Sequence, residues 1–128
     1  SYALVLIDVD HFKAINDTFS HQTGDRILRE VAATLRAHCR AGDIAVRLGG
    51  DEFALFLRTD PAGAAQVAER IREVLAAHDW KEFGADQRVT LSIGVAQCAR
   101  GMDGATLYDR ADQQLYNAKR RGRDQVSV

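Results

Sequence analysis

The feature that most constrains the fold is a continuous apolar run near the start of the chain, Ala3-Leu-Val-Leu-Ile7. A strand in which every side chain is apolar is typical of the centre of a sheet, where other elements cover both faces. The run ends in Asp8-Val-Asp10. The sequence therefore predicts a covered central strand with two carboxylates at one end.

Two periodicities divide the rest of the chain. Alternating apolar side chains predict strands, and Gly49-Gly50 between two of them predicts a hairpin, because tight turns need positive φ angles. Apolar side chains at helical spacing predict helices. The predicted strands are residues 3–7, 44–48, 53–57, 89–95 and 126–128. The predicted helices are residues 11–19, 23–39, 61–78 and 105–121, with a loop at 82–87. This order indicates an α/β mixed sheet with helices packed on it.

The length and net charge of the chain limit the classes of function that it can have. The chain has 128 residues, which fits one domain with one core, and its 46% hydrophobic and 27% charged residues are ordinary for a globular protein. The net charge is -1, so no overall field recruits a nucleic acid polymer or an anionic membrane. Any phosphate binding must come from locally placed lysine and arginine side chains.

Two cysteines, Cys39 and Cys98, lie far apart and form no CxxC pattern. They predict reduced, mostly buried thiols in a cytoplasmic protein. One disulfide in a secreted domain is the alternative, but nothing else in the sequence indicates secretion. No apolar stretch approaches the length of a membrane span, and no signal peptide is visible. Because the chain enters a strand almost directly after Ser1, we expect an upstream segment to be missing.

The first candidate site is the end of the opening strand. Asp8 and Asp10 are two residues apart, which predicts that both carboxylates leave one face of the strand. Carboxylates placed there can hold a hard cation such as Mg²⁺. A helix begins directly afterwards, its free N–H groups attract phosphate, and Lys13 adds positive charge. The alternative is that Asp10 only caps the helix and Asp8 is solvated.

The second candidate is the hairpin Gly49-Gly-Asp-Glu-Phe53. Glycines let the backbone approach a ligand closely, and two acids directly after a tight turn are an unusual use of charge. An exposed polar hairpin is the alternative. If the hairpin packs beside the first strand, Asp51 or Glu52 approaches Asp8. Two carboxylates from different elements could then share two metal ions, which suits in-line displacement at phosphorus.

The third candidate is the basic segment from Lys119 to Arg123. Both side chains could neutralise a triphosphate, although basic residues at a helix C-terminus are also favoured by the helix dipole alone. The four histidines, at positions 11, 21, 38 and 78, show no metal-ligand spacing. No Ser/His/Asp or Cys/His arrangement and no Walker-type loop is evident.

The segment Arg47-Leu-Gly-Gly-Asp-Glu-Phe53 resembles the signature of GGDEF domains, the diguanylate cyclases. Four further blocks agree in order with that family, and the resemblance spans nearly the whole chain. The blocks are residues 8–13 with 15–17, His21 with 24–25, 90–96, and 111–123. The implied fold is a ferredoxin-like βααββαβ mixed sheet with flanking helices, as in nucleotidyl cyclases and polymerase palms. Three positions depart from the family pattern: Ser20, Gln114 and Asp124.

The resemblance also implies residue roles. Two Mg²⁺ or Mn²⁺ ions in each half-site would be held by Asp8, the Val9 carbonyl and Asp51. The implied catalytic residues are Asp51, as proton acceptor or metal-held activator, Glu52 in support, and Lys13. Guanine would be bound by Asn16 and Asp25, and the phosphates by Lys13, Lys119 and Arg123. The remaining implied substrate-binding positions are Phe12, His21, Gly49 and Gly50.

The implied reaction joins two GTP molecules into cyclic di-GMP and two pyrophosphates. Each domain would be half an active site, so two chains must meet as an antiparallel homodimer. Arg40, Asp43 and Arg70 match an inhibitory product site of the family. We expect residues 1–128 to be this domain without its N-terminal segment and without any regulatory domain, with no direct membrane contact.

Three other functions stay open. A GGDEF domain can act as a receptor that holds GTP or cyclic di-GMP without turnover. It can also serve mainly as a dimerisation scaffold beside another output domain. A different nucleotidyl transferase is less favoured, because Asn16 and Asp25 fit guanine recognition.

Overall fold

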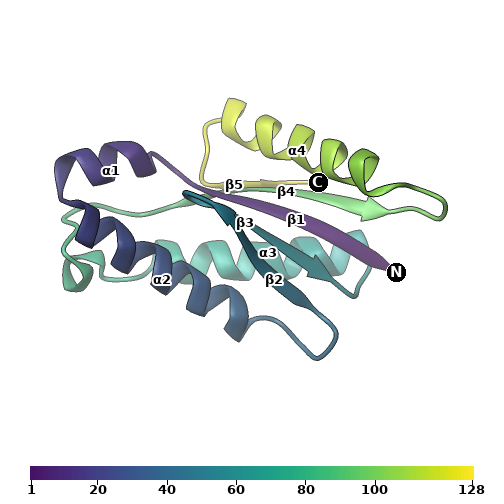
Figure 1. The fold of residues 1–128 in the computed structure, drawn as a ribbon, viewed down its shortest axis with the longest axis horizontal. Helices are drawn as coiled ribbons and strands as arrows, with labels where there is room; N and C mark the ends of the chain where they lie inside the picture. Colours follow the sequence, from purple (N-terminus) through teal and green to yellow (C-terminus); the bar gives the residue numbers. More distant parts are fainter.

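The apolar run forms β1 (Tyr2–Val9), the middle strand of a five-stranded sheet in the order β2-β3-β1-β4-β5. The computed structural model describes all residues from 1 to 128. β1 pairs antiparallel with both neighbours, β3 and β4, while β5 pairs parallel with β4 (Figure 1). The prediction of a covered central strand in a mixed sheet is therefore confirmed.

The observed elements follow the predicted order β-α-α-β-β-α-β-α-β. The other strands are β2 (Ile44–Gly49), β3 (Glu52–Leu57), β4 (Leu91–Cys98) and β5 (Gln125–Ser127). The helices are α1 (Phe12–Thr18), α2 (His21–Ala37), α3 (Pro61–Ala76) and α4 (Gly104–Arg120). A 3₁₀ helix, η1 (Trp80–Phe83), is added before β4.

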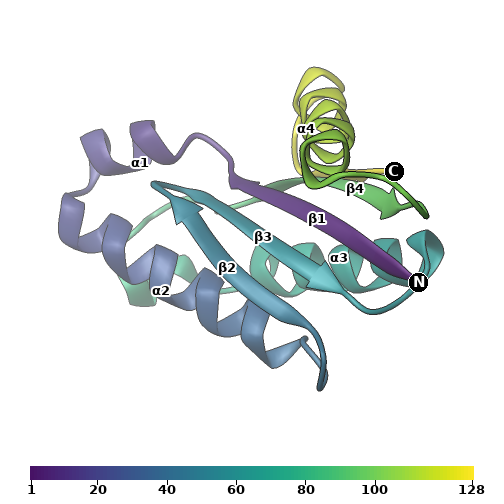
Figure 2. The same cartoon turned by 45° about the vertical axis from the view of Figure 1, so that its right-hand side comes forward.

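Helices lie on both faces of the sheet, as the apolar strand requires. α2 and α3 pack on one face, α4 packs on the other, and α1 lies beyond the strand ends (Figures 1 and 2). Side chains of β1 alternate between two hydrophobic clusters: Val5 and Ile7 join the larger one under α2 and α3, and Leu6 joins Ala111 and Leu115 of α4. This pleat fixes α4 above β1 and β4.

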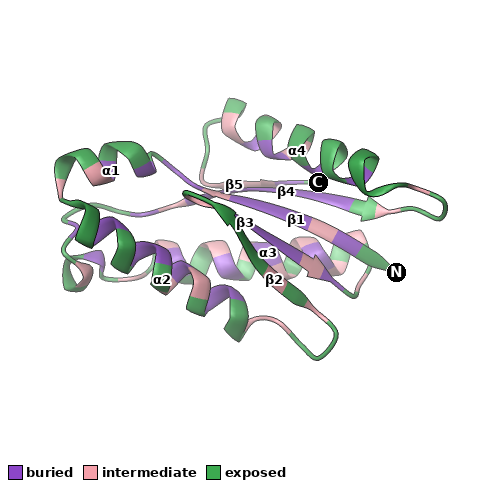
Figure 3. Ribbon diagram, viewed as in Figure 1, coloured by how far each residue is buried: buried purple, intermediate pink, exposed green.

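Helix α4 covers only part of its face of the sheet and leaves the side chains of β2 on that face exposed. The outward side chains of β2, namely Ile44, Val46 and Leu48, are 56%, 45% and 46% exposed. Beside them Tyr2 stacks on Phe56, with ring centroids 5.3 Å apart. Figure 3 shows β2 as mostly exposed, in contrast to the buried β1 and β4. An apolar strip of this kind is a surface on which another segment can pack.

Several predicted boundaries and details are corrected by the structure. α2 begins at His21 rather than at residue 23, because the Ser20 side chain caps it by accepting the Thr23 N–H at 3.0 Å. β4 covers residues 91–98 rather than 89–95. The 3₁₀ helix was not predicted; the buried indole N–H of Trp80 donates to the Leu75 carbonyl oxygen at 2.9 Å. Cys39 and Cys98 are free thiols, as predicted, but only partly buried.

All three departures from the family pattern make side-chain contacts. Besides Ser20, Gln114 accepts a hydrogen bond from the Ser127 hydroxyl at 2.7 Å, and Asp124 forms an ion pair with Arg72 at 2.8 Å. None of the helices combines the length and apolar character needed to cross a bilayer.

The contact between α4 and β4 depends on Gly94. A Cβ atom at this position would lie 2.2 Å from the Leu115 backbone nitrogen and 2.4 Å from the Ala111 carbonyl oxygen. Because neither backbone atom can move alone, we expect Gly94→Ala to lower the free energy of unfolding by about 1–3 kcal/mol in urea denaturation. Gly104→Ala is the matched control, since a Cβ there meets no atom within 4 Å. Equal stabilities of the two variants would contradict this view of the helix–sheet contact.

Candidate functional site

Asp8 and Asp51 meet at one end of the central strand pair. The antiparallel register of β1 and β3 places Asp8 opposite Glu52, and the Val9 N–H donates to the Asp51 carbonyl oxygen at 3.2 Å. The Asp51 carboxyl lies near enough to Asp8 for the charge of Asp8 to raise the pKa of Asp51. The predicted convergence of the strand end and the hairpin acid is therefore confirmed.

The hairpin turn that carries Asp51 is fixed by backbone geometry. Gly49 and Gly50 have φ angles of 148° and 52°, values that favour glycine. The Arg47 guanidinium donates to the Gly50 carbonyl oxygen at 3.0 and 2.7 Å, which ties the turn to its own strand. A Cβ atom at either glycine would meet nothing within 4 Å, so this side of the turn is open to a ligand.

Charge at the site is unbalanced. Burial, followed by the hydrogen bond and the negative charge of Asp8, raises the pKa of Asp51 from 3.8 to about 6, although Lys119 acts in the opposite direction. Lys119 at the end of α4 forms an ion pair with Oδ2 of Asp8. Oδ1 of Asp8 is buried and has no hydrogen-bond partner. The pair thus offers an unsatisfied carboxylate oxygen and excess negative charge.

These properties fit a hard divalent cation. Carboxylate oxygens are its preferred ligands, and one or two carboxylates plus phosphate oxygens are a common set for Mg²⁺. No group of three or more His, Cys, Asp or Glu side chains assembles anywhere in the chain. Asp8 and Asp51 could therefore hold an ion together with backbone, substrate or water oxygens.

Asp10 does not belong to this pair. It is only 5% exposed, and its carboxylate accepts the Ser92 hydroxyl at 2.6 Å, the Thr90 hydroxyl at 2.7 Å and the Asp124 N–H at 3.0 Å. The N-cap of α1 is His11, without a side-chain cap bond. The prediction that Asp10 caps α1 is therefore wrong. Asp10 does lie on the α4 side of the sheet with Asp8, because Ser92, which pairs with Asp8, donates to it, but these three hydrogen bonds occupy its carboxylate.

Glu52 has a partner that sequence reasoning missed. The Tyr108 hydroxyl of α4 donates to Oε1 of Glu52 at 3.2 Å. Burial, with added effects from the Glu52 carboxylate, raises the pKa of Tyr108. The spacing of Tyr108 on the exposed side of a helix gave no signal of this contact, which depends on how α4 crosses the sheet.

The predicted guanine residues lie where α1 meets α2. Gly24 allows the two helices to touch: a Cβ there would lie 1.8 Å from Oδ1 of Asn16 and 3.1 Å from the Phe12 ring. Oδ1 of Asn16 is buried without a hydrogen-bond partner. The remaining predicted residues of this segment, namely Lys13, His21 and Asp25, are exposed. These side chains are free to meet a ligand.

At the C-terminal end of α4, Lys119 and Arg123 lie in one helix end and turn. Arg123 is exposed and forms no ion pair within the chain, whereas Lys119 contacts Asp8 as described. The predicted phosphate-binding position Lys119 is thus brought to the acid pair.

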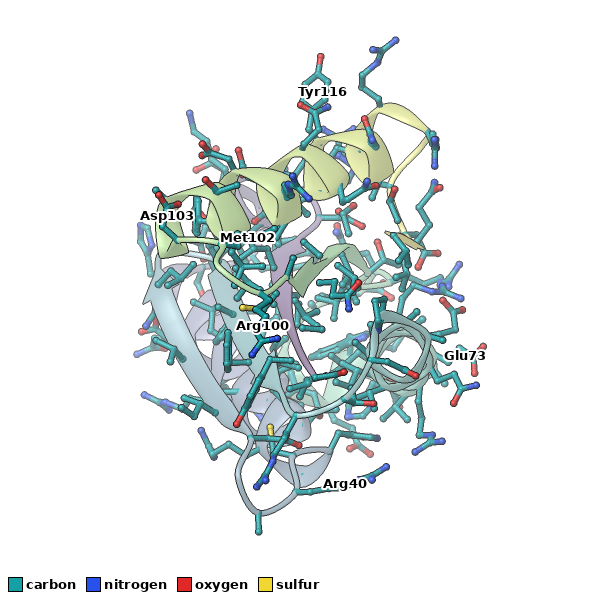
Figure 4. All side chains as sticks on the ribbon, turned by 90° about the vertical axis from the view of Figure 1, so that its right-hand side faces the viewer. Arg40, Glu73, Arg100, Met102, Asp103 and Tyr116 are labelled. Carbon is teal, nitrogen blue, oxygen red and sulfur yellow. The ribbon has the colours of Figure 1, made fainter.

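A second cluster lies at the opposite end of β2. Arg40, Asp43 and Arg70 line one small depression together with His38 and Gln66. Figure 4 shows Arg40 on a loop at one edge of the molecule, far from Tyr116 of α4. The Asp43 carboxylate accepts the backbone N–H groups of Arg40, at 2.8 Å, and of Arg58, at 2.9 Å. Asp43 therefore shapes the loop that presents Arg40.

The raised pKa of Asp51 predicts a pH dependence of stability in the metal-free protein. Between about pH 4 and pH 6 the folded chain keeps a proton that the unfolded chain has lost, so the free energy of unfolding falls as pH rises through this window. Solvent screening of the partly exposed carboxyl limits the effect to about 1 kcal/mol.

Asp51→Asn should remove this slope and stabilise the metal-free protein at pH 7, as measured by urea denaturation in chelator at several pH values. Asp86→Asn, at an exposed loop acid, is the control and should leave the slope in place. An unchanged slope in Asp51→Asn would contradict the assignment.

Comparison with known proteins agrees with this geometry. Residues 1–125 match the family model described as "Diguanylate cyclase, GGDEF domain". The chain is 40% identical over 126 residues to diguanylate cyclase DgcP of Pseudomonas aeruginosa, covering 98% of this chain and 19% of that protein. It is 40% identical over 128 residues to diguanylate cyclase A of Treponema denticola, covering 98% of this chain and 34% of that protein. The chain therefore spans only a minor part of these curated relatives.

Solved structures show the same fold. The GGDEF domain of DgcB from Caulobacter crescentus, solved with c-di-GMP, has a TM-score of 0.92 at 35% identity, covering 98% of this chain and 76% of that one. The active GGEEF domain of a Vibrio cholerae diguanylate cyclase has a TM-score of 0.90 at 34% identity, covering 99% and 81%. By its sequence, its fold and the acid pair at one end of its central strands, the chain belongs to the GGDEF domain family of diguanylate cyclases.

Proposed function

We propose that this domain condenses two GTP molecules into cyclic di-GMP and two pyrophosphates. The observation that carries the proposal is the convergence of Asp8 and Asp51, with Lys119 beside them. This arrangement suits phosphoryl transfer, and relatives at about 40% identity are named diguanylate cyclases.

Asp8, Asp51 and the Val9 carbonyl would hold two Mg²⁺ or Mn²⁺ ions. When bound, these ions lower the pKa of the ribose 3′-hydroxyl and offset phosphate charge. Asp51 accepts the proton as the 3′-oxygen bonds to the α-phosphorus of the second GTP. The bond from that phosphorus to the bridging oxygen breaks, and pyrophosphate leaves with its electron pair.

Basic side chains would stabilise the charge that develops on the phosphates. Lys119 already lies at the acid pair, so it can offset charge on the phosphates there. Arg123 has no internal ion pair and can bind phosphate oxygens through its forked N–H groups. Lys13 lies on the exposed face of α1 and would contact the phosphates and steady the transition state. Glu52, held by Tyr108, supports the site.

The base of GTP would lie between α1 and α2. Asn16 and Asp25 offer an amide and a carboxylate, which complement the donor and acceptor edge of guanine. Phe12 and His21 would complete this part of the site, and Gly49 and Gly50 leave open space at the hairpin turn. Each chain holds one GTP, so two chains must meet antiparallel about a two-fold axis for each hydroxyl to reach the other phosphorus.

A receptor that binds GTP or cyclic di-GMP without turnover is the second candidate. A receptor has no need to hold the Asp51 carboxyl beside Asp8, where burial and the neighbouring charge raise the pKa of Asp51. The presence of Asp8, Asp51 and Glu52 at one edge therefore favours catalysis over the receptor and over a dimerisation scaffold.

The full protein would extend beyond these residues. The bare apolar strip along β2 gives an N-terminal segment a place to pack, and the longer relatives leave room for regulatory domains. Because its substrate is GTP, the domain would act on the cytoplasmic side.

Arg40, Asp43 and Arg70 would form a product site that inhibits turnover. Two guanidinium groups in one depression suit the paired phosphates of cyclic di-GMP. The site lies far from Asp51, at the other end of β2, so product bound there would not displace substrate directly.

The activity is tested by incubating the protein with GTP and Mg²⁺ and separating nucleotides by chromatography. Wild type should form cyclic di-GMP. Asp51→Asn should lower the rate by about 10²–10⁴-fold, because it removes the proton acceptor, while the circular dichroism spectrum stays unchanged. Asp86→Asn should retain full activity. GTP binding by wild type with no product would establish the receptor function instead.

The product site is tested with Arg40→Ala. Loss of a charge-assisted contact should raise the cyclic di-GMP concentration for half-inhibition by about tenfold or more, with the uninhibited rate unchanged. Arg36→Ala, an arginine of α2 outside the depression, should keep wild-type inhibition. Asp43 is a poor target, because its carboxylate also holds the loop. Unchanged inhibition in Arg40→Ala would show that product binds elsewhere.

A further inference from the structure

Asp10 is a buried carboxylate to which the proposed reaction gives no part. Its two oxygens accept hydrogen bonds from the Thr90 and Ser92 hydroxyls at the start of β4 and from the Asp124 N–H after α4. A buried charge is costly unless hydrogen bonds satisfy it, and here three donors from two distant segments do so. Asp10 therefore joins the end of β1 to the turn between α4 and β5.

Backbone strain gathers around this carboxylate. The chain has three non-glycine residues with positive φ, namely His11 at 56°, Arg123 at 64° and Asp124 at 47°. His11 follows Asp10 directly, and Arg123 and Asp124 form the turn that Asp10 holds. Such residues keep this conformation only where their surroundings enforce it, and they are frequent at functional sites.

The strained turn carries the basic groups of the proposed phosphate site. The Arg123 N–H donates to the Ala118 carbonyl oxygen at 3.0 Å, and the Gly122 N–H donates to that of Lys119 at 3.3 Å. Any shift of the turn therefore moves Lys119 and Arg123 together. From its other side, the Asp124 carboxylate holds Arg72 of α3 at 2.8 Å.

We propose that Asp10 is a positioning residue for the triphosphate: its carboxylate holds the 122–124 turn so that Lys119 and Arg123 face the Asp8–Asp51 pair. The proposal rests on the proposed function, because it assumes that this edge binds GTP. It assigns Asp10 no contact with substrate. If Asp10 only stabilised the fold, its loss would weaken the binding of every ligand to the same degree. If Asp10 positions the basic groups, its loss weakens binding of the β- and γ-phosphates and leaves binding of the base unchanged.

The test compares two ligands by calorimetry in Mg²⁺. The first is 3′-deoxy-GTP, which keeps the triphosphate but lacks the attacking hydroxyl and so cannot condense. The second is GMP, which lacks the β- and γ-phosphates. Asp10→Ala removes both carboxylate oxygens, so the Asp124 N–H loses its acceptor. We expect affinity for 3′-deoxy-GTP to fall about tenfold or more, and affinity for GMP to change less than about twofold.

Ser92→Ala is the matched control. It removes a buried hydroxyl from the other oxygen of Asp10 and leaves the Asp124 bond in place. It should lower stability while keeping the wild-type ratio of the two affinities. Asp10→Asn keeps one acceptor oxygen for the Asp124 N–H but loses the charge, so it should give a smaller loss with the same selectivity and serves if Asp10→Ala does not fold.

A double-mutant cycle tests whether Asp10 acts through the turn that carries Arg123. If Asp10 acts through the turn, the losses of Asp10→Ala and Arg123→Ala for 3′-deoxy-GTP will be less than additive. Equal losses for both ligands, no loss, or strict additivity would overturn the positioning role while leaving the proposed function standing. Failure of wild type to bind 3′-deoxy-GTP would overturn both.

Discussion

The antiparallel pairing of β1 and β3 is the constraint on which the site depends. It places Asp8 opposite Glu52 and brings the Asp51 backbone within hydrogen-bond distance of Val9. Two carboxylates are thereby held together at a partly buried edge, where neither is fully hydrated. The pKa of Asp51 rises to about 6 as a result. The fold thus maintains a local excess of negative charge, which a divalent cation can relieve.

The other elements are arranged around this edge. Gly94 lets α4 lie against β4, and that contact carries Lys119 to Asp8. Asp10 joins the end of β1 to the turn that follows α4. α1 follows the end of β1, and α2 touches α1 at Gly24. Groups from distant parts of the chain therefore meet at one end of the sheet, and each is held by a contact that tolerates little change.

Much of this could be predicted from the sequence, because the signals were local. The apolar run of residues 3–7 and the Gly49-Gly50 turn predicted a central strand and a hairpin. Pairing of the two predicted the approach of Asp51 to Asp8. These inferences need only side-chain alternation and turn chemistry, which short segments encode.

What the sequence did not show depends on long-range geometry. The two-residue spacing from Asp8 to Asp10 placed both side chains on one face, but it could not show that the Thr90 and Ser92 hydroxyls and the Asp124 N–H occupy the Asp10 carboxylate. The contact between Tyr108 and Glu52 depends on how α4 crosses the sheet. Trp80 was missed because 3₁₀ helices have weak sequence signals, and its burial comes from packing under α3. No local pattern carries this information.

Titration of Asp51, followed through its carbon-13 carboxyl resonance with and without Mg²⁺, tests the shared cation site most directly. Without metal, Asp51 should titrate near pH 6, and saturating Mg²⁺ should lower this value clearly, because the cation favours the charged form. A carboxyl that titrates near its ordinary value of 3.8 and does not respond to Mg²⁺ would contradict the claim that Asp8 and Asp51 form a shared cation site.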